Sequence, residues 1–227
     1  MSLLQSIAAF TRGGVTATQA YQRDWSPFLV HLTRAASMDQ LRSAVLNGMR
    51  PMDVSARLLE ADDSSFETVN AIFKSAMLMR SPSTIGSDVP TRVCLSECIL
   101  AGLLAMSDRY GRFGFVYRKQ DVFDFGGRPC AYVDQPSYDR IKQRAQARDA
   151  DEVDRQIHAI TNVYRPKAPR FQDFTHEREW RVLKDMPFAA VAPIALVCPA
   201  RFVNQIRERW EGPMQVIDIE MLFEWGA

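Results

Sequence analysis

The residues best suited to chemistry lie in segment 177–183, where two glutamates are separated by one residue. In an extended strand Glu177, Glu179 and Arg181 share one face, because successive side chains point to opposite faces. Two carboxylates about 7 Å apart repel each other unless an arginine or a cationic transition state compensates them. The pair therefore suits chemistry that develops positive charge, such as cleavage of a glycosidic bond. The alternative is a solvated edge strand in which arginines balance the glutamates and Trp180 packs in the core.

A second polar pair lies within the apolar segment 28–33, FLVHLT. Strand alternation places His31 and Thr33 on one face together with Leu29. An imidazole and a hydroxyl near the end of a buried strand can hydrogen-bond the amide or the ribose of a ligand. The alternative is a core histidine whose ring bonds a backbone carbonyl.

Ser96 lies where an expected strand, 92–96, meets an apolar helix that begins at Glu97. Serine is a good N-cap, and a glutamate in the first turn suits the helix dipole. The free N–H groups of such a junction can also face a ligand phosphate. Without a glycine-rich loop, the junction alone does not separate a cap from a phosphate site.

Other catalytic patterns are absent from the sequence, which holds no P-loop, no GxGxxG after a strand, no HExxH and no GxSxG. The four cysteines are spread widely, and only Cys94 and Cys98 are close, so we predict buried reduced thiols and no metal site. His176 precedes the second of the two glutamates by three residues and can line the same cleft or lie in a loop. His158 is expected to be exposed in a charged helix.

The overall composition is that of a globular protein. Hydrophobic residues make up 47% and charged residues 24%, which excludes a disordered chain. The 28 basic and 27 acidic residues leave a net charge of +1, so no overall field holds nucleic acid or an anionic membrane, although a local basic patch is compatible with it. The first residues lack a basic leader with a cleavage site, and no apolar run approaches the roughly 18 residues of a membrane helix. We therefore expect a cytoplasmic protein without a membrane partner.

Short apolar runs predict the elements that must position these side chains. Strands are expected at 28–33, 92–96, 113–117, 130–133, 177–183, 193–197 and 214–219. Helices are expected at 37–48, 64–79, 97–106 and 200–208, the second opening with Ser64 and Glu67 as a capping pair. Alternating charges predict a solvent-facing helical insertion that, with a basic loop, spans 136–175. The irregular order favours an α+β fold around a mixed sheet, with 1–227 as one domain.

Six segments follow one another along the chain: VHLTR, SMDQLRSAVLNGM, VCLSECILAGLL, YGRFGFVYRKQ, RPCAYVD and EREWRVLKDMPFAAVAPIALVC. In order and spacing they resemble AbiGi-type abortive-infection proteins of bacteria and, more distantly, the DarT-like ADP-ribosyltransferases of toxin–antitoxin systems. The similarity covers residues 28–135 and 174–205. It implies an α+β fold with an ADP-ribosyltransferase-like split mixed β-sheet and flanking helices, and NAD as the cofactor.

The resemblance also implies the cofactor-binding residues. His31, Thr33 and Gly48 match one wall of the family's NAD pocket, and Ser96 lies in the strand that runs into the helix beneath it. His31 and Thr33 are therefore expected to hold the nicotinamide ribose in a cleft between two halves of the split sheet.

The function implied by the resemblance is NAD-dependent transfer of ADP-ribose to a macromolecule, nucleic acid or protein, in phage defence or a toxin–antitoxin system. Glu179 matches the catalytic glutamate, and Glu177 resembles the first glutamate of the ExE pair of arginine-specific ADP-ribosyltransferases. The rival class is a non-catalytic antitoxin or interaction protein on the same fold. The expected protein partner is a cognate antitoxin if the chain is a toxin and a cognate toxin if it is an antitoxin.

A basic loop precedes the glutamate strand. Arg165, Lys167 and Arg170 lie between aromatic residues in YRPKAPRF, and His176 follows. At the mouth of the cleft these side chains would contact phosphates or acidic groups of the acceptor. The alternative is a solvated connecting loop.

Overall fold

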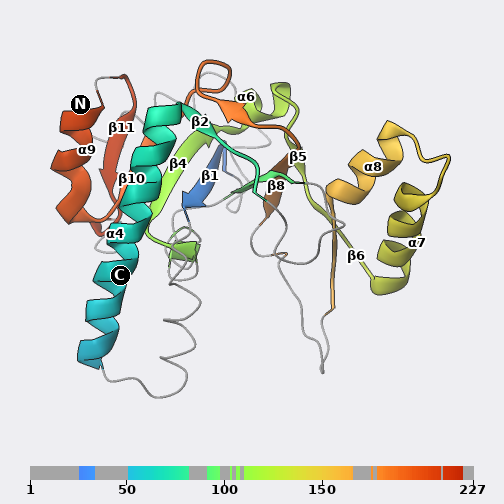
Figure 1. Cartoon of the computed structure of the whole chain (residues 1–227), viewed down its shortest axis with the longest axis horizontal. Helices are drawn as coiled ribbons and strands as arrows, with labels where there is room; N and C mark the ends of the chain where they lie inside the picture. Colours follow the sequence, from blue (N-terminus) through green and yellow to red (C-terminus); the bar gives the residue numbers. More distant parts are fainter. Residues whose placement is uncertain are drawn as a thin grey trace.

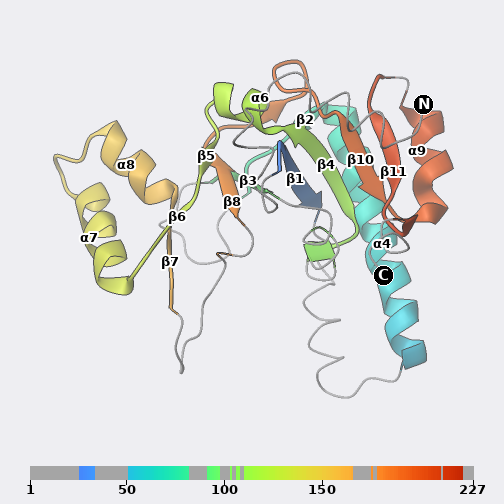
Figure 2. The ribbon, with the colours of Figure 1, turned by 180° about the vertical axis from the view of Figure 1, so that it is seen from behind.

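We describe the protein from a computed structural model, which covers residues 26–33, 51–81, 91–97, 103, 106–107, 110–165, 175, 178–210 and 212–221. In these residues the chain forms a seven-stranded mixed sheet flanked by helices (Figures 1 and 2). The α+β class expected from the sequence is confirmed. The helix expected at 37–48 lies outside the described residues.

Each strand expected from the sequence overlaps an observed one. The strands of the main sheet are β1 (Phe28–Thr33), β3 (Val93–Ser96), β4 (Phe113–Arg118), β5 (Arg128–Pro129), β8 (Glu179–Val182), β10 (Ala195–Cys198) and β11 (Gln215–Asp218). Two small sheets pair β2 (Met77–Leu78) with β9 (Met186–Pro187) and β6 (Ala131–Val133) with β7 (Thr161–Val163). The helices are α4 (Pro51–Ser75), α6 (Lys119–Asp124), α7 (Gln135–Gln146), α8 (Glu152–Ala159) and α9 (Val203–Arg209), the last preceded by the 3-10 turn η2 (Ala200–Phe202).

The order of the main sheet, β11-β10-β4-β1-β3-β8-β5, places β1 at its centre (Figure 1). Neighbouring strands are antiparallel except β10 and β11, which run parallel and are connected through α9. β1 pairs with β4 along its whole length, whereas its register with β3 in the described residues is the single pair Val30–Ser96. In the described residues, β1 therefore pairs with β4 over a longer stretch than with β3.

Helices α4 and α9 lie over one face of the sheet, and that face carries most of the core (Figure 1). Phe66 of α4 stacks near Phe202 of η2 and Phe113 of β4, with ring centroids 4.6 and 6.2 Å away. The opposite face packs Val30 of β1 and Val197 of β10 in a smaller cluster. Side chains on these two faces are therefore separated by the sheet itself.

Helix α4 begins at Pro51, well before the expected start at Ser64. The capping pair Ser64 and Glu67 lies inside the helix, so the expected N-terminus is wrong. Proline suits the first helical position because that residue needs no N–H partner, and this start signal prevails over the internal serine. The helix also ends earlier than expected, at Ser75, because Met77–Leu78 forms β2. No helix in the described ranges is long and apolar enough to cross a membrane.

Helices α7 and α8 form a pair beyond the β5 edge of the sheet, away from α4 and α9 (Figures 1 and 2). The helical character expected for this charged segment is confirmed. The expected exposure of His158 is wrong: the residue is 3% exposed, and its ring centroid lies 5.6 Å from that of Tyr138. The short strand β7, which the sequence did not predict, follows α8 and pairs with β6.

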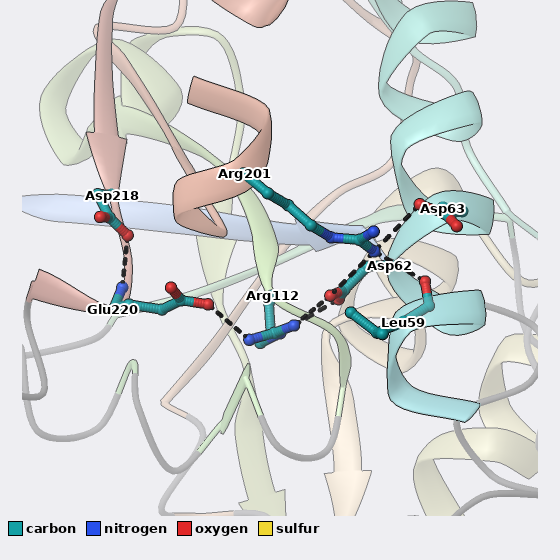
Figure 3. A network of polar contacts seen from close by, with 7 residues as sticks. All are labelled: Leu59, Asp62, Asp63, Arg112, Arg201, Asp218 and Glu220. Atoms are coloured by element: carbon teal, nitrogen blue, oxygen red, sulfur yellow. Dashed lines mark hydrogen bonds and ion pairs between the residues drawn. The ribbon is translucent and has the colours of Figure 1, made fainter. Parts of the chain in front are cut away.

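The buried carboxylate of Asp62 in α4 forms ion pairs with residues of other elements (Figure 3). Asp62 is 2% exposed and forms ion pairs with Arg112, which precedes β4, and with Arg201 of η2. Arg112 also lies 2.9 Å from a carboxylate oxygen of Glu220, just after β11. The neighbouring Asp63 is exposed and pairs with Arg201 at 3.0 Å. This network holds α4 against the ends of three other elements.

Asp62→Asn is expected to lower the free energy of unfolding by about 2–4 kcal/mol, because Arg112 and Arg201 would lose their shared buried carboxylate and Arg112 would keep only the exposed carboxylate of Glu220. Asp63→Asn is the matched control, since it removes an exposed carboxylate one residue away and is expected to cost about 0–1 kcal/mol. Urea denaturation of both variants measures the difference. Equal losses would contradict a special role for the buried carboxylate.

Candidate functional site

The start of β8 places Glu179 on the face of the sheet that α4 does not cover. Glu179 pairs in register with Ser96 of β3, and Trp180 pairs with Leu95. Trp180 and Leu95 belong to the core beneath α4. Because side chains alternate along a strand, Glu179 and Ser96 lie together on the other face.

Arg181 holds Glu179 in a bidentate ion pair. Its Nε lies 3.0 Å from one carboxylate oxygen and its Nη2 lies 2.9 Å from the other. Arg181 is 2% exposed, and its Nη1 donates to the carbonyl oxygens of Ala159 and Thr161 at 2.8 and 3.0 Å. The last residue of α8 and the first residue of β7 therefore cover Arg181. The side chain of Glu179 is 11% exposed.

Two thiols flank this carboxylate. Cys94 of β3 lies opposite Arg181 in the register, and the backbone N–H of Cys130 donates to the carbonyl of Glu179 at 2.7 Å. Burial, aided by the charge of Glu179 and a hydrogen bond to it, raises the pKa of each thiol to about 12. Burial also acts to raise the pKa of Glu179, but the hydrogen bonds and charge of Arg181 outweigh it and leave this pKa below its ordinary value. At neutral pH the thiols are therefore protonated and the carboxylate is ionised.

His31 and Thr33 lie on the opposite face from Glu179. Their register partners are phenylalanines of β4 in the core beneath α4. His31 Nδ1 lies 2.8 Å from the carbonyl oxygen of Cys94, and burial lowers the pKa of its ring, which favours the neutral form. The structure thus brings Ser96 to Glu179 but leaves His31 and Thr33 on the other side of the sheet. His31 has the contact of a core histidine bonded to a backbone carbonyl.

A glutamate that the sequence associated with a helix dipole is the centre of a separate cluster. The side chain of Glu97 is 7% exposed, and its Oε1 lies 2.8 Å from Lys119 Nζ and 3.2 Å from Arg178 Nη2. The backbone N–H of Ser26 donates to the same oxygen at 3.3 Å. Lys119 Nζ lies 5.8 Å from the ring centroid of Trp180, so this cluster is on the α4 side of the sheet. Arg178 has a φ of +44°, a conformation that is strained for an arginine.

The residues expected to contact the acceptor are mostly beyond what the structure describes. Arg165 is described, and its guanidinium donates to the side chain of Gln135 in α7. The other expected site residues outside the described ranges are Gly48, Lys167, Arg170, His176 and Glu177. Within the described ranges no group of three His, Cys, Asp or Glu side chains could hold a metal ion.

The surroundings of Glu179 hold an ionised carboxylate in a fixed position. An ionised carboxylate is fixed by Arg181, with the hydroxyl of Ser96 on the same face. Such a preorganised charge acts more strongly in a partly buried site than in water. No protein-family model, no curated protein and no solved structure matches this chain. The roles of individual residues therefore rest on this geometry and on the resemblance of the sequence segments.

Proposed function

We propose that the chain is an ADP-ribosyltransferase-like enzyme that cleaves the nicotinamide–ribose bond of NAD and transfers ADP-ribose to a macromolecule. It would act as a cytoplasmic toxin or effector in a phage-defence or toxin–antitoxin system. The observation that carries the proposal is the carboxylate of Glu179, which is ionised, fixed by Arg181 and partly exposed on the face of Ser96.

In this proposal Glu179 acts through its charge. Positive charge develops on the ribose as nicotinamide leaves NAD, and a fixed carboxylate stabilises that charge without having to reorganise. Arg181 keeps Glu179 ionised and holds both of its oxygens in place. The hydroxyl of Ser96 can hydrogen-bond the ribose on the same face. His31 and Thr33 take no part, because they lie on the other face of the sheet.

A non-catalytic antitoxin or interaction protein on the same fold is the second candidate. It is favoured by the same ion pair, because both oxygens of Glu179 accept from Arg181 and the side chain is only 11% exposed. In this reading the pair is structural. The ion pair then stabilises the packing of β8 against α8 and β7, because Arg181 also donates hydrogen bonds to the carbonyl oxygens of Ala159 and Thr161.

Release of nicotinamide from NAD, with cell lysate as the source of acceptor, separates the two candidates. The Glu179→Gln/Arg181→Met variant removes both charges together, and we expect its rate to fall by about 10²–10³-fold. Arg128→Met is the matched control, because it removes an exposed arginine of β5 that lies opposite Arg181 in the register and leaves the pair of Glu179 and Arg181 in place, so it is expected to retain most of the activity. Circular dichroism checks that both variants are folded. Equal rates in the wild type and the double variant, or no release by the wild type, would contradict the enzyme and favour the interaction protein.

A further inference from the structure

Helices α7 and α8 and the turn between them, residues 135–159, form a hairpin that projects beyond the β5 edge of the sheet (Figures 1 and 2). In α7, which the structure describes completely, no side chain is buried. In α8, also described completely, the buried residues are His158 and Ala159 at its end. Helices of 12 and 8 residues depend on packing, because so short a helix is marginal in water. Within the described part of the chain, the hairpin packs on little besides itself and β7.

One side of α8 is apolar and exposed. Val153 and Ile157 lie one turn apart on the same side of the helix, and they are 60% and 44% exposed. Covering two such side chains is favourable, because it removes apolar surface from water. Single exposed apolar residues are common on protein surfaces, whereas a neighbouring pair on an otherwise unpacked helix indicates a surface that binds another molecule.

The charges of the hairpin are divided into two blocks. Residues 140–148 hold four basic residues and no acidic one, and we call them the basic block. Residues 149–154, in the turn and the start of α8, hold four acidic residues and no basic one, and we call them the acidic block. Within one chain the two blocks meet through two ion pairs of Arg144, each of 3.0 Å. Both blocks also present exposed charged side chains, among them Arg140, Arg148 and Glu152.

We propose that the hairpin is the interface of a homodimer, in which α8 of one protomer packs against α7 of its partner. A two-fold dimer brings the same surface of both copies together, so that surface must be complementary to itself. The hairpin meets this condition, because the acidic block of each copy faces the basic block of the other. The aliphatic stems of the partner's exposed arginines cover Val153 and Ile157, while their guanidinium groups stay at the acidic block. The net charge of +1 leaves little repulsion between two copies.

Sedimentation velocity of the full chain tests the dimer without any NAD chemistry. An interface of two short helices from each copy predicts a weak dimer, so we expect the wild type to pass from monomer to dimer at about 1–100 µM. Val153→Gln/Ile157→Gln keeps side chains that suit a helix but removes the apolar face, and is expected to weaken the dimer at least about tenfold. Met79→Gln/Met221→Gln is the matched control: it removes two exposed apolar side chains outside the hairpin and should dimerise like the wild type.

Charge exchange between the blocks tests the pairing of one copy with another. The first variant makes the basic block acidic: Arg140→Glu/Lys142→Glu/Arg148→Glu. The second makes the acidic block and the residues that follow it basic: Asp149→Lys/Glu152→Lys/Gln156→Lys. Each variant alone is expected to be monomeric over the same concentrations, because blocks of like charge meet. An equal mixture should form heterodimers, since each block then faces one of opposite charge. Circular dichroism checks that the helices are formed, and mixing would not repair a folding defect.

Three results would overturn the proposal. They are a wild type that stays monomeric throughout the concentration range, a dimer that Val153→Gln/Ile157→Gln leaves unchanged, and charge variants that stay monomeric when they are mixed. The first would leave the exposed face of α8 to a protein of another kind, and the second would place the dimer interface elsewhere on the chain. None of these outcomes bears on the release of nicotinamide from NAD, so the dimer and the enzymatic function are tested separately.

Discussion

Glu179→Gln is expected to lower the free energy of unfolding by about 3–5 kcal/mol. The substitution leaves Arg181, which is 2% exposed, with a buried charge and two carbonyl partners in place of a carboxylate. A glutamate in an open cleft would predict a loss of no more than about 1 kcal/mol. Urea denaturation at pH 7 measures the loss. Glu179→Gln/Arg181→Met is the matched control. Its free energy of unfolding is expected to fall less than that of the single variant, because no unpaired buried charge remains.

The stability difference between the wild type and Glu179→Gln is also expected to depend on pH. The pKa of Glu179 is lower in the folded protein than its ordinary value, chiefly because the hydrogen bonds and charge of Arg181 outweigh burial. Its contribution to stability is therefore fully present above about pH 4.3, the ordinary glutamate pKa, and is lost as the pH falls through the folded value. The stability difference between the wild type and Glu179→Gln should narrow below about pH 4. A difference that stays constant in acid would contradict an ionised, paired Glu179.

The same variant is expected to activate two thiols. Burial, with the charge of Glu179, raises the pKa of Cys94 and Cys130 to about 12, while two nearby arginines act in the opposite direction. Once Glu179 is neutral the arginines act alone, so the thiolate fraction at pH 8 rises. Alkylation by iodoacetamide, read by peptide mass spectrometry, should be at least about tenfold faster at both residues. Cys198 in β10 is the internal control and should be unchanged, because Glu179 does not contribute to its raised pKa.

Sequence alternation predicted correctly that Glu179 and Arg181 share a face, because side-chain direction along a strand is a local property. It could not predict that Arg181 bonds carbonyls at the end of α8, since that contact depends on how a distant segment packs. The same holds for His31. Its face within β1 was predictable, but its side relative to Glu179 depends on the registers of β1 with β3 and of β3 with β8. Residues that are polar neighbours in a pattern can therefore lie on opposite sides of a sheet.

The ion-pair partners of Glu97 could not be predicted from the sequence either. Its sequence neighbours predicted a role in the first turn of a helix, whereas its ion-pair partners come from the residue after β4 and the residue before β8. Antiparallel pairing of β3 with β8 brings Arg178 beside it, and the backbone N–H of Glu97 donates to the carbonyl of Arg178 at 3.2 Å. Its position directly after a buried strand was the one sequence signal for a buried glutamate. Its ion-pair partners depend on how distant segments pair in the fold.

Glu97→Gln is expected to lower the free energy of unfolding by about 2–4 kcal/mol. The carboxylate is 7% exposed, and the substitution removes the negative charge that lies 2.8 Å from Lys119 Nζ, on a side chain that is 16% exposed. Arg178 is 37% exposed and contributes less, because solvent screens it. Arg178→Gly is therefore a suitable comparison: it removes the screened ion pair and relieves the positive φ, so its stability should change by less than about 1 kcal/mol.

The stability of Glu97→Gln at alkaline pH distinguishes an effect of the lost carboxylate charge from an effect of lost packing. Burial lowers the pKa of Lys119 in the folded protein, and Glu97 opposes that effect. In Glu97→Gln the folded pKa should fall further below the ordinary lysine value of about 10.4, so that between the two values the unfolded chain binds more protons and stability rises with pH. The variant should therefore regain part of its lost stability between pH 7 and pH 10. Glu97→Gln/Lys119→Met should be more stable than Glu97→Gln at pH 7 and should show no such recovery. A loss that is independent of pH and is not rescued by Lys119→Met would mean that Glu97 stabilises the fold by packing and hydrogen bonding and not by its charge.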